Sequence, residues 1–291
     1  ALVGALSDLS VSSVYRTQWT NHNNQGYNSS LSDVMYARGT VGAGLYIRND
    51  WGLLNNLRHE VGVTLNNTLE NEKIELRYGL KLNYIRNNLT GVEASGMSNI
   101  VNYWLGPIPI RKPPLHYPNP HRSELRSGIG GSLAIKDILL GFSLTEFNIS
   151  GKENSFRPPL TNFSVAYARP LGDFTASSQL SILSYPIIFY PNDRQYLRTT
   201  TMVPFGVNLT YKAFRFGSEY RYVNNLGNGA IVNSILFKAG YNVEKLSFSY
   251  VFENTGVEPQ SPLRSHELSA AWHINGRKQN SKTERILRSL F

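Results

Sequence analysis

The sequence predicts an all-β fold, a transmembrane antiparallel barrel of about 14 strands. Three observations support this prediction: large apolar side chains alternate with small or polar ones, the polar face carries glycine, serine and charges of both signs, and short turns alternate with long loops. The stretch FKAGYNVEKLSFSYVF at 237–252 is one example, because Leu246, Phe248 and Tyr250 alternate with serines after a turn.

The composition limits the possible classes of protein. The chain has 291 residues and no cysteine, which excludes disulfides and thiolate chemistry. The net charge of +9 is spread along the chain rather than gathered in a patch, which argues against nucleic acid as a partner.

No secretory signal peptide is visible at Ala1, so the chain is either cytoplasmic or a mature or trimmed form. The longest uncharged window, 174–192, contains Pro186 and Pro191 and is not predicted to be a transmembrane helix.

The period-two alternation recurs along the whole chain and defines the expected strands in order. The segments are 11–19, 30–36 (the weakest), 41–47, 61–65, 74–84, 125–135, 138–144, 163–167, 174–182, 203–211, 214–222, 231–237, 246–252 and 268–274. Each carries apolar side chains on one face and polar ones on the other, as a strand with two different environments requires.

The composition of the polar faces distinguishes a barrel from a soluble sandwich. The solvent-exposed face of a soluble sandwich is rich in Lys and Glu and seldom needs glycine. Here the polar faces carry glycine, serine and charges of both signs, for example at 75–83, 124–132 and 215–221. Apolar side chains facing lipid and polar side chains facing a crowded lumen are typical of a transmembrane barrel, and closure leaves no strand edge unpaired in lipid.

The connection lengths provide an independent test. Six connections are short, at 37–39, 70–73, 136–137, 169–173, 212–213 and 243–245. The connections between them are mostly longer, at 20–29, 49–56, 87–123, 148–162, 185–201, 224–229 and 254–265. This regularity predicts an outer membrane barrel with periplasmic turns, extracellular long loops and both termini in the periplasm.

Several segments resemble one family. Tyr15, Arg16, Gln18 and Trp19 match a Tyr-Arg-x-Gln-Trp motif that ends the first strand of PorP/SprF type IX secretion system membrane proteins. The segments VGAGLYIRNDWG (41–52), GSEYRYV (217–223), GAIVNSILFKAGYNVEKLSFSYVFENTG (229–256) and SHELSAAWHI (265–274) are similar to the same family in the same order.

The resemblance implies a non-enzymatic outer membrane barrel of Bacteroidota that serves type IX secretion or gliding motility. Its expected partners are a secreted cell-surface adhesin, recognised through its C-terminal domain for export or surface anchoring, other type IX secretion or gliding components, and outer membrane lipid. No cofactor and no metal are expected.

The luminal charges are the candidate site. If the register is right, one interior receives the following residues: Arg16, Glu75, Arg77, Glu124, Arg126, Arg215, Glu219, Arg221 and Glu267. They are either a surface that binds an inserted partner or an ion-paired plug, and the plug is favoured because an unpaired buried charge is costly.

Two regions depart from the typical family pattern. The loop 87–123 is proline-rich and either docks a partner or forms a stiff lid, with Trp104, Pro109, Arg111 and Tyr117 as candidate contacts. We expect residues 1–274 to form the barrel and 275–291 a basic periplasmic tail. In that tail Ile286, Leu287, Leu290 and Phe291 share one face of a short helix that contacts anionic lipid or a periplasmic partner, or else frays.

Other functions fit the sequence less well. Ser265 and His266 adjoin, and His116 and His121 share a loop, but adjacency alone does not supply the hydrogen-bonded geometry of a hydrolase. An outer membrane porin or substrate-specific channel is the alternative to a partner barrel, and a soluble lectin-like sandwich is a third possibility.

Overall fold

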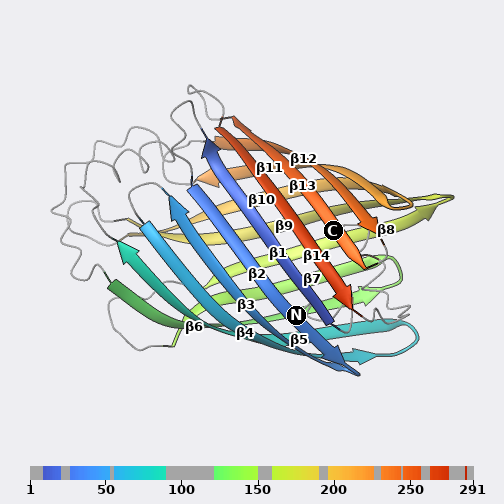
Figure 1. Ribbon diagram of the computed structural model, residues 1–291, viewed down its shortest axis with the longest axis horizontal. Coiled ribbons are helices and arrows are strands. Elements are labelled where there is room, and N and C mark those ends of the chain that lie inside the picture. Colours follow the sequence, from blue (N-terminus) through green and yellow to red (C-terminus); the bar gives the residue numbers. More distant parts are fainter. Residues whose placement is uncertain are drawn as a thin grey trace.

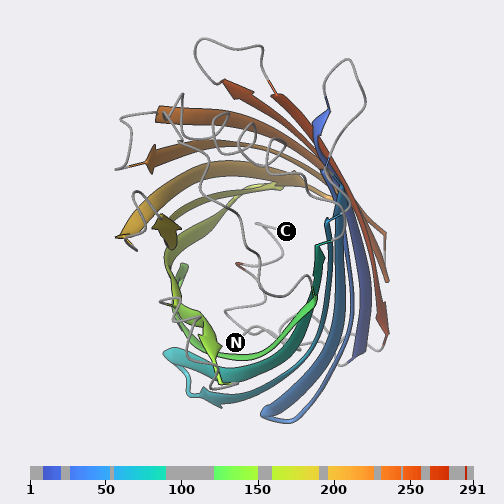
Figure 2. The same cartoon turned by 90° about the vertical axis from the view of Figure 1, so that its left-hand side faces the viewer.

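The computed structural model describes residues 9–20, 27–52, 56–89, 121–149, 159–189, 196–225, 231–243, 245–256, 263–274 and Ile286. They form one closed antiparallel barrel of 14 strands. Figure 1 shows the barrel from the side, and Figure 2 looks into the ring of strands. The strands are β1 (Leu9–Thr20), β2 (Tyr27–Arg38), β3 (Val41–Gly52), β4 (Asn56–Glu70), β5 (Ile74–Leu89), β6 (His121–Ile135), β7 (Ile138–Asn148), β8 (Leu160–Leu171), β9 (Phe174–Phe189), β10 (Tyr196–Tyr211), β11 (Phe214–Asn225), β12 (Ile231–Val243), β13 (Leu246–Gly256) and β14 (Leu263–Ile274). The predicted fold class is confirmed.

The ring closes where the first strand meets the last. Each strand pairs with its neighbours in the sequence, and β1 pairs with both β2 and β14, with Leu9 opposite Ile274 and Tyr15 opposite Leu268. Because no strand edge is left open, every strand has a hydrogen-bonded neighbour on both sides, as a barrel in lipid requires. We call the contact between β1 and β14 the seam.

The two ends of the barrel differ. Tight turns join β2 to β3, β6 to β7, β8 to β9 and β10 to β11. The turns at 136–137 and 212–213 lie on the predicted residues, whereas those at 39–40 and 172–173 overlap the predicted connections 37–39 and 169–173. Their first residues take positive φ, at Gly39, Lys136, Gly172 and Lys212, which suits the twist of a two-residue hairpin. We call this end the turn end and the other the loop end. Since Leu9 pairs with Ile274, the barrel wall begins and finishes at the turn end.

The outer face is apolar around the ring. Large side chains such as Leu45, Leu80, Phe216, Phe237 and Leu268 project from it with about half of their surface exposed. The strands have 11 to 16 residues, and a tilted strand of ~9–11 residues crosses a bilayer. The wall therefore has both the surface and the length to span a membrane. None of the helical residues that the structure describes belongs to a helix able to span a membrane.

The luminal face carries the buried polar residues. Glu60, Glu75, Arg126, Asn208 and Glu219 are each at least nine-tenths buried and alternate with outward apolar neighbours. Of the predicted tail, the structure describes Ile286, which is fully buried in a cluster with Ala134, Leu139, Ala166 and Ala168.

Candidate functional site in the barrel lumen

The luminal charges are organised as acid–base pairs two residues apart on one strand. Such residues share a face of the strand, so an arginine side chain reaches the neighbouring carboxylate without leaving the wall. The pairs are Arg48–Asp50 on β3, Arg58–Glu60 on β4, Glu75–Arg77 on β5, Glu124–Arg126 on β6 and Glu219–Arg221 on β11.

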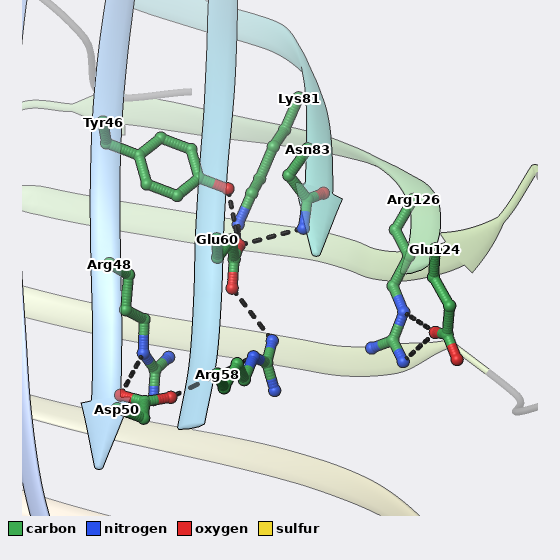
Figure 3. Close-up of polar contacts among 9 residues, drawn as sticks. All are labelled: Tyr46, Arg48, Asp50, Arg58, Glu60, Lys81, Asn83, Glu124 and Arg126. Atoms are coloured by element: carbon green, nitrogen blue, oxygen red, sulfur yellow. Dashed lines mark hydrogen bonds and ion pairs between the residues drawn. The ribbon is translucent and has the colours of Figure 1, made fainter. Parts of the chain in front are cut away.

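The first cluster is centred on Glu60 and comprises Tyr46, Arg48, Asp50, Arg58, Glu60, Lys81 and Asn83 (Figure 3). Tyr46 donates to Glu60 Oε1 at 2.6 Å, Asn83 donates to the same oxygen at 2.9 Å, and Lys81 Nζ lies 3.3 Å from it. Arg58 donates to the other oxygen, Oε2, at 2.9 Å. One buried carboxylate thus collects donors from three neighbouring strands.

Arg58 also joins the pair on the neighbouring strand to this cluster. Its Nε lies 4.0 Å from Asp50 Oδ2, while Arg48 Nε donates to Asp50 Oδ1 at 2.9 Å. The ring of Tyr46 lies across Gly62, which is opposite it in the register, and a Cβ at Gly62 would collide with that ring. Glycine at 62 therefore leaves the space through which the tyrosine hydroxyl reaches Glu60.

The second cluster comprises Arg16, Gln179, Glu219, Arg221, Ser234, Lys238 and Glu253. Glu219 accepts from Arg221 Nε and Lys238 Nζ, each at 2.6 Å, and from Gln179 Nε2 at 3.0 Å. The Nη1 of Arg221 is 3.2 Å from Glu253 Oε1, so this arginine joins two carboxylates.

Glu253 extends the second cluster across the seam. Its Oε2 accepts from Arg16 Nη2 of β1 at 2.6 Å, and its Oε1 accepts from Ser234 Oγ at 2.9 Å. Since β14 lies between β13 and β1, this ion pair spans one intervening strand.

The two clusters lie on opposite walls of the lumen. Their centres are on β4 and β11, seven places apart (11 − 4) in a ring of 14 strands. In both, the acids are buried and the bases partly exposed: the side-chain exposure is 43 % for Arg48 against 2 % for Asp50, and 23 % for Arg221 against 5 % for Glu219. The lumen therefore presents N–H donors of cations whose charge is balanced behind them, an arrangement suited to acidic or carbonyl-rich groups.

The predicted site residues do not all meet. Arg16, Glu219 and Arg221 belong to the second cluster. The predicted residue Glu267 is half-buried on β14 opposite Arg16 in the register.

The other predicted pairs stand apart along the wall. Glu75 pairs with Arg77 near the turn end, with the carboxylate 2.6 Å from Nε, and Glu124 pairs with Arg126 at 2.8 Å toward the loop end. Arg215 lies over Gly240, where a Cβ would be 2.8 Å from its Nη2. Its Nη1 is buried and has no hydrogen-bond partner in the part of the chain that the structure describes.

The candidate loop contacts Trp104, Pro109, Arg111 and Tyr117 lie outside the described residues. Partner contact by any of the predicted residues stays a prediction.

The prediction omitted half of the charged network. It did not include Tyr46, Arg48, Asp50, Arg58, Glu60, Lys81, Lys238 or Glu253. A usable signal existed in the sequence. Arg48-x-Asp50 and Arg58-x-Glu60 have the same spacing as Glu219-x-Arg221, and they too occupy the alternate strand positions that face the lumen. The contact of Glu253 with Arg16 has no such signal, because the two residues are 237 positions apart in the sequence.

The geometry separates the adjoining Ser265 and His266. Ser265 is buried on the luminal face, while His266 lies on the outer face, where its Nδ1 is 2.7 Å from the Tyr250 hydroxyl. Neighbours in a strand point to opposite faces, so these two side chains do not form a nucleophile–base pair. The structure shows no group of His, Asp and Glu suited to a metal ion among the residues it describes.

Comparison with solved structures supports the barrel fold. The outer membrane protein Omp33 of Acinetobacter baumannii matches with a TM-score of 0.54 at 8 % identity, covering 93 % of this chain and 100 % of that one. The toluene transporter TodX of P. putida matches with a TM-score of 0.52 at 10 % identity, covering 92 % of this chain and 90 % of that one. At these identities the likeness shows the fold. The search of curated proteins found no match.

An apolar exterior, a closed ring and a charged lumen define an outer membrane β-barrel protein. More specifically, the chain belongs to the PorP/SprF family of type IX secretion system membrane proteins, whose family model matches residues 1–272. The predicted family is confirmed, and the chain is a type IX secretion membrane protein of the outer membrane.

Proposed function

We propose that this protein is a non-enzymatic partner barrel of type IX secretion and gliding motility in a Bacteroidota-type outer membrane. It engages a secreted cell-surface adhesin through that protein's C-terminal domain, for export or for anchoring at the surface. In this proposal the long loops are extracellular and both termini are periplasmic. Family membership supports the role in secretion, and the cationic donor surface of the lumen supports the binding of a polypeptide.

The main support comes from the two clusters, in which the bases are partly exposed while their acids are buried. Lys81 has 34 % of its side chain exposed against 4 % for Glu60, and Lys238 has 21 % against 5 % for Glu219. A cation held in place by a buried acid keeps donors available to a guest and loses little side-chain freedom when it binds. We therefore propose that the adhesin segment that enters the lumen is rich in carboxylates and free carbonyls.

The test begins with extraction of the protein from its own outer membrane in mild detergent and mass spectrometry of the co-purifying proteins. A large surface protein bound through its C-terminal domain is the expected result. A lone barrel with a steady open conductance would overturn the proposal and favour a porin or substrate-specific channel.

A matched pair of variants tests the lumen itself. Lys81→Gln removes a luminal charge, whereas Lys73→Gln makes the same change in the exposed connection between β4 and β5. We expect the first variant to retain less adhesin, on the order of 10-fold, because a charge-assisted hydrogen bond is lost. Equal retention by both variants would remove the lumen from the proposal.

A further inference from the structure

Arg215 differs from the other buried arginines of the lumen in having no acid beside it on its strand. Three arginines are at least nine-tenths buried among the residues that the structure describes: Arg77, Arg126 and Arg215. Arg77 and Arg126 each form an ion pair with the acid two residues before them on their own strand. The residues two before and two after Arg215 are Ala213 and Gly217, which carry no charge.

The strands around Arg215 supply no acid either. The sequences of β9, β10 and β12 contain no Asp or Glu, and Glu219 is the acid of β11. Glu219 is four residues from Arg215 along the strand. It already accepts hydrogen bonds from three side chains, Arg221, Lys238 and Gln179. A buried charge that is left unpaired costs free energy, so the guanidinium of Arg215 calls for an anion from elsewhere.

Two more polar side chains beside Arg215 lack partners within the described ranges. Asn208 of β10 is 6 % exposed, and both its Oδ1 and its Nδ2 are buried without a hydrogen bond, as is Thr210 Oγ1. Thr210 is directly opposite Arg215 in the register, and Asn208 is its diagonal neighbour. A guanidinium, an amide and a hydroxyl group thus lie together on the luminal face, near the turn end.

Two glycines leave the space in which these side chains lie. Arg215 lies over Gly240 of β12, where a Cβ would be 2.8 Å from its Nη2 and 3.2 Å from its Nε. Asn208 lies over Gly217 of β11, where a Cβ would collide with its amide. The two glycines are diagonal neighbours in the register of β11 with β12. A larger residue at either position would displace one of the donors, so the backbone itself fixes where the donors lie.

We propose that Arg215, Asn208 and Thr210 form a carboxylate-binding site in the luminal wall. A carboxylate carries one negative charge and accepts hydrogen bonds at two oxygens, which suits one planar guanidinium and two neutral donors. A dianion would leave one charge unbalanced, because the neighbouring base Lys238 is paired with Glu219. The carboxylate belongs either to a guest polypeptide or to a free organic acid. The inference rests on the wall itself and not on the proposed adhesin partnership, so either can fail without the other.

Acetate is the probe that tests the site directly. Thermal unfolding is measured on the purified barrel in mild detergent, with sodium acetate replacing sodium chloride at constant ionic strength. The Tm should rise with acetate and saturate, whereas acetamide, which has a similar shape and no charge, should leave it unchanged. Arg215→Gln should abolish the rise, and Arg169→Gln, the same change on the exposed outer face near the turn end, should keep it. An equal rise in Arg215→Gln and the native barrel, or none in the native barrel, would overturn the proposal.

Two further variants separate a binding site from a purely structural arginine. Gly240→Ala keeps the charge of Arg215 but displaces its guanidinium, and should weaken acetate binding on the order of 10-fold. Without acetate, Arg215→Gln should raise the Tm because it removes an unpaired buried charge. Arg126→Gln should lower it, because Glu124 loses its partner. A lower Tm in both glutamine variants, or native acetate affinity in Gly240→Ala, would show that Arg215 does not serve as a carboxylate site.

Adhesin retention then identifies the source of the carboxylate. If Arg215→Gln loses both acetate binding and co-purifying adhesin, the carboxylate belongs to the guest polypeptide. If it loses acetate binding and retains the adhesin, the ligand is a free organic acid. The acetate measurements need no adhesin, so they decide on the site even where no surface protein co-purifies.

Discussion

The two ionic clusters of the lumen share a plan but differ in reach. In each, an arginine bridges two carboxylates: Arg58 lies between Glu60 and Asp50, and Arg221 lies between Glu219 and Glu253. The first cluster stays on the neighbouring strands β3, β4 and β5. The second passes from β9 to β11, β12 and β13 and across the seam to β1. The same local unit therefore stabilises one part of the wall in the first case and the closure of the ring in the second.

The largest effect is expected from Glu60→Ala. Removing this carboxylate leaves Tyr46, Lys81 and Asn83 without their buried acceptor, and breaking a buried ion pair costs about 3–5 kcal/mol. Denaturant unfolding of the barrel in lipid or detergent measures this loss. Glu70→Ala, at the exposed end of the same strand, should stay within ~0.5 kcal/mol. Equal losses in the two variants would show that the first cluster does not stabilise the fold.

Glu253→Ala is expected to lower the free energy of unfolding by less, and to loosen a different part of the barrel. Glu253 accepts hydrogen bonds from three side chains, Arg16, Arg221 and Ser234, whereas Glu60 accepts from four, so fewer donors lose their acceptor and we expect about 2–3 kcal/mol. Hydrogen exchange should rise in β1 and β14 beside the seam, whereas Glu60→Ala should raise it in β3 to β5. Exchange that rises in the same strands for both variants would end the distinction between the clusters.

The smallest effect is expected from Gly62→Ala. The added methyl group pushes the Tyr46 ring away from Glu60, at a cost of about 1–2 kcal/mol. Gly131→Ala is the control, because the nearest atom to its added Cβ is the Arg77 carbonyl oxygen at 3.4 Å, an ordinary contact. In a double-mutant cycle, Gly62→Ala should cost much less in a Tyr46→Phe background. Additive losses would mean that the glycine serves some purpose other than placing the tyrosine.

The fold was predictable because its signal is local. Alternation of large apolar and small polar residues has a period of two only in a strand, so it located the strands and separated their faces. The tight turns at 136–137 and 212–213 were predicted where the structure has them. The segment 138–144 was predicted too short, because a bulge in the pairing of β6 with β7 shifts the register beyond Gly128 and Thr145 and ends the simple alternation.

The candidate site was predictable only in part. The period-two alternation assigned residues such as Glu75, Arg77 and Arg126 to the luminal face. Their partners, two residues away, could be predicted from the same strand. The alternation does not give the register between neighbouring strands, so the convergence of Tyr46, Arg58 and Lys81 on Glu60 could not be predicted.

The sequence by itself determined the strands, the turns and the face on which each side chain lies, because these depend on neighbours in the chain. Only the tertiary structure decided that Arg16 meets Glu253 across the seam and that Ile286 lies against the β6–β8 wall. Both contacts join residues far apart in the sequence, and their positions depend on the closure and register of the whole ring.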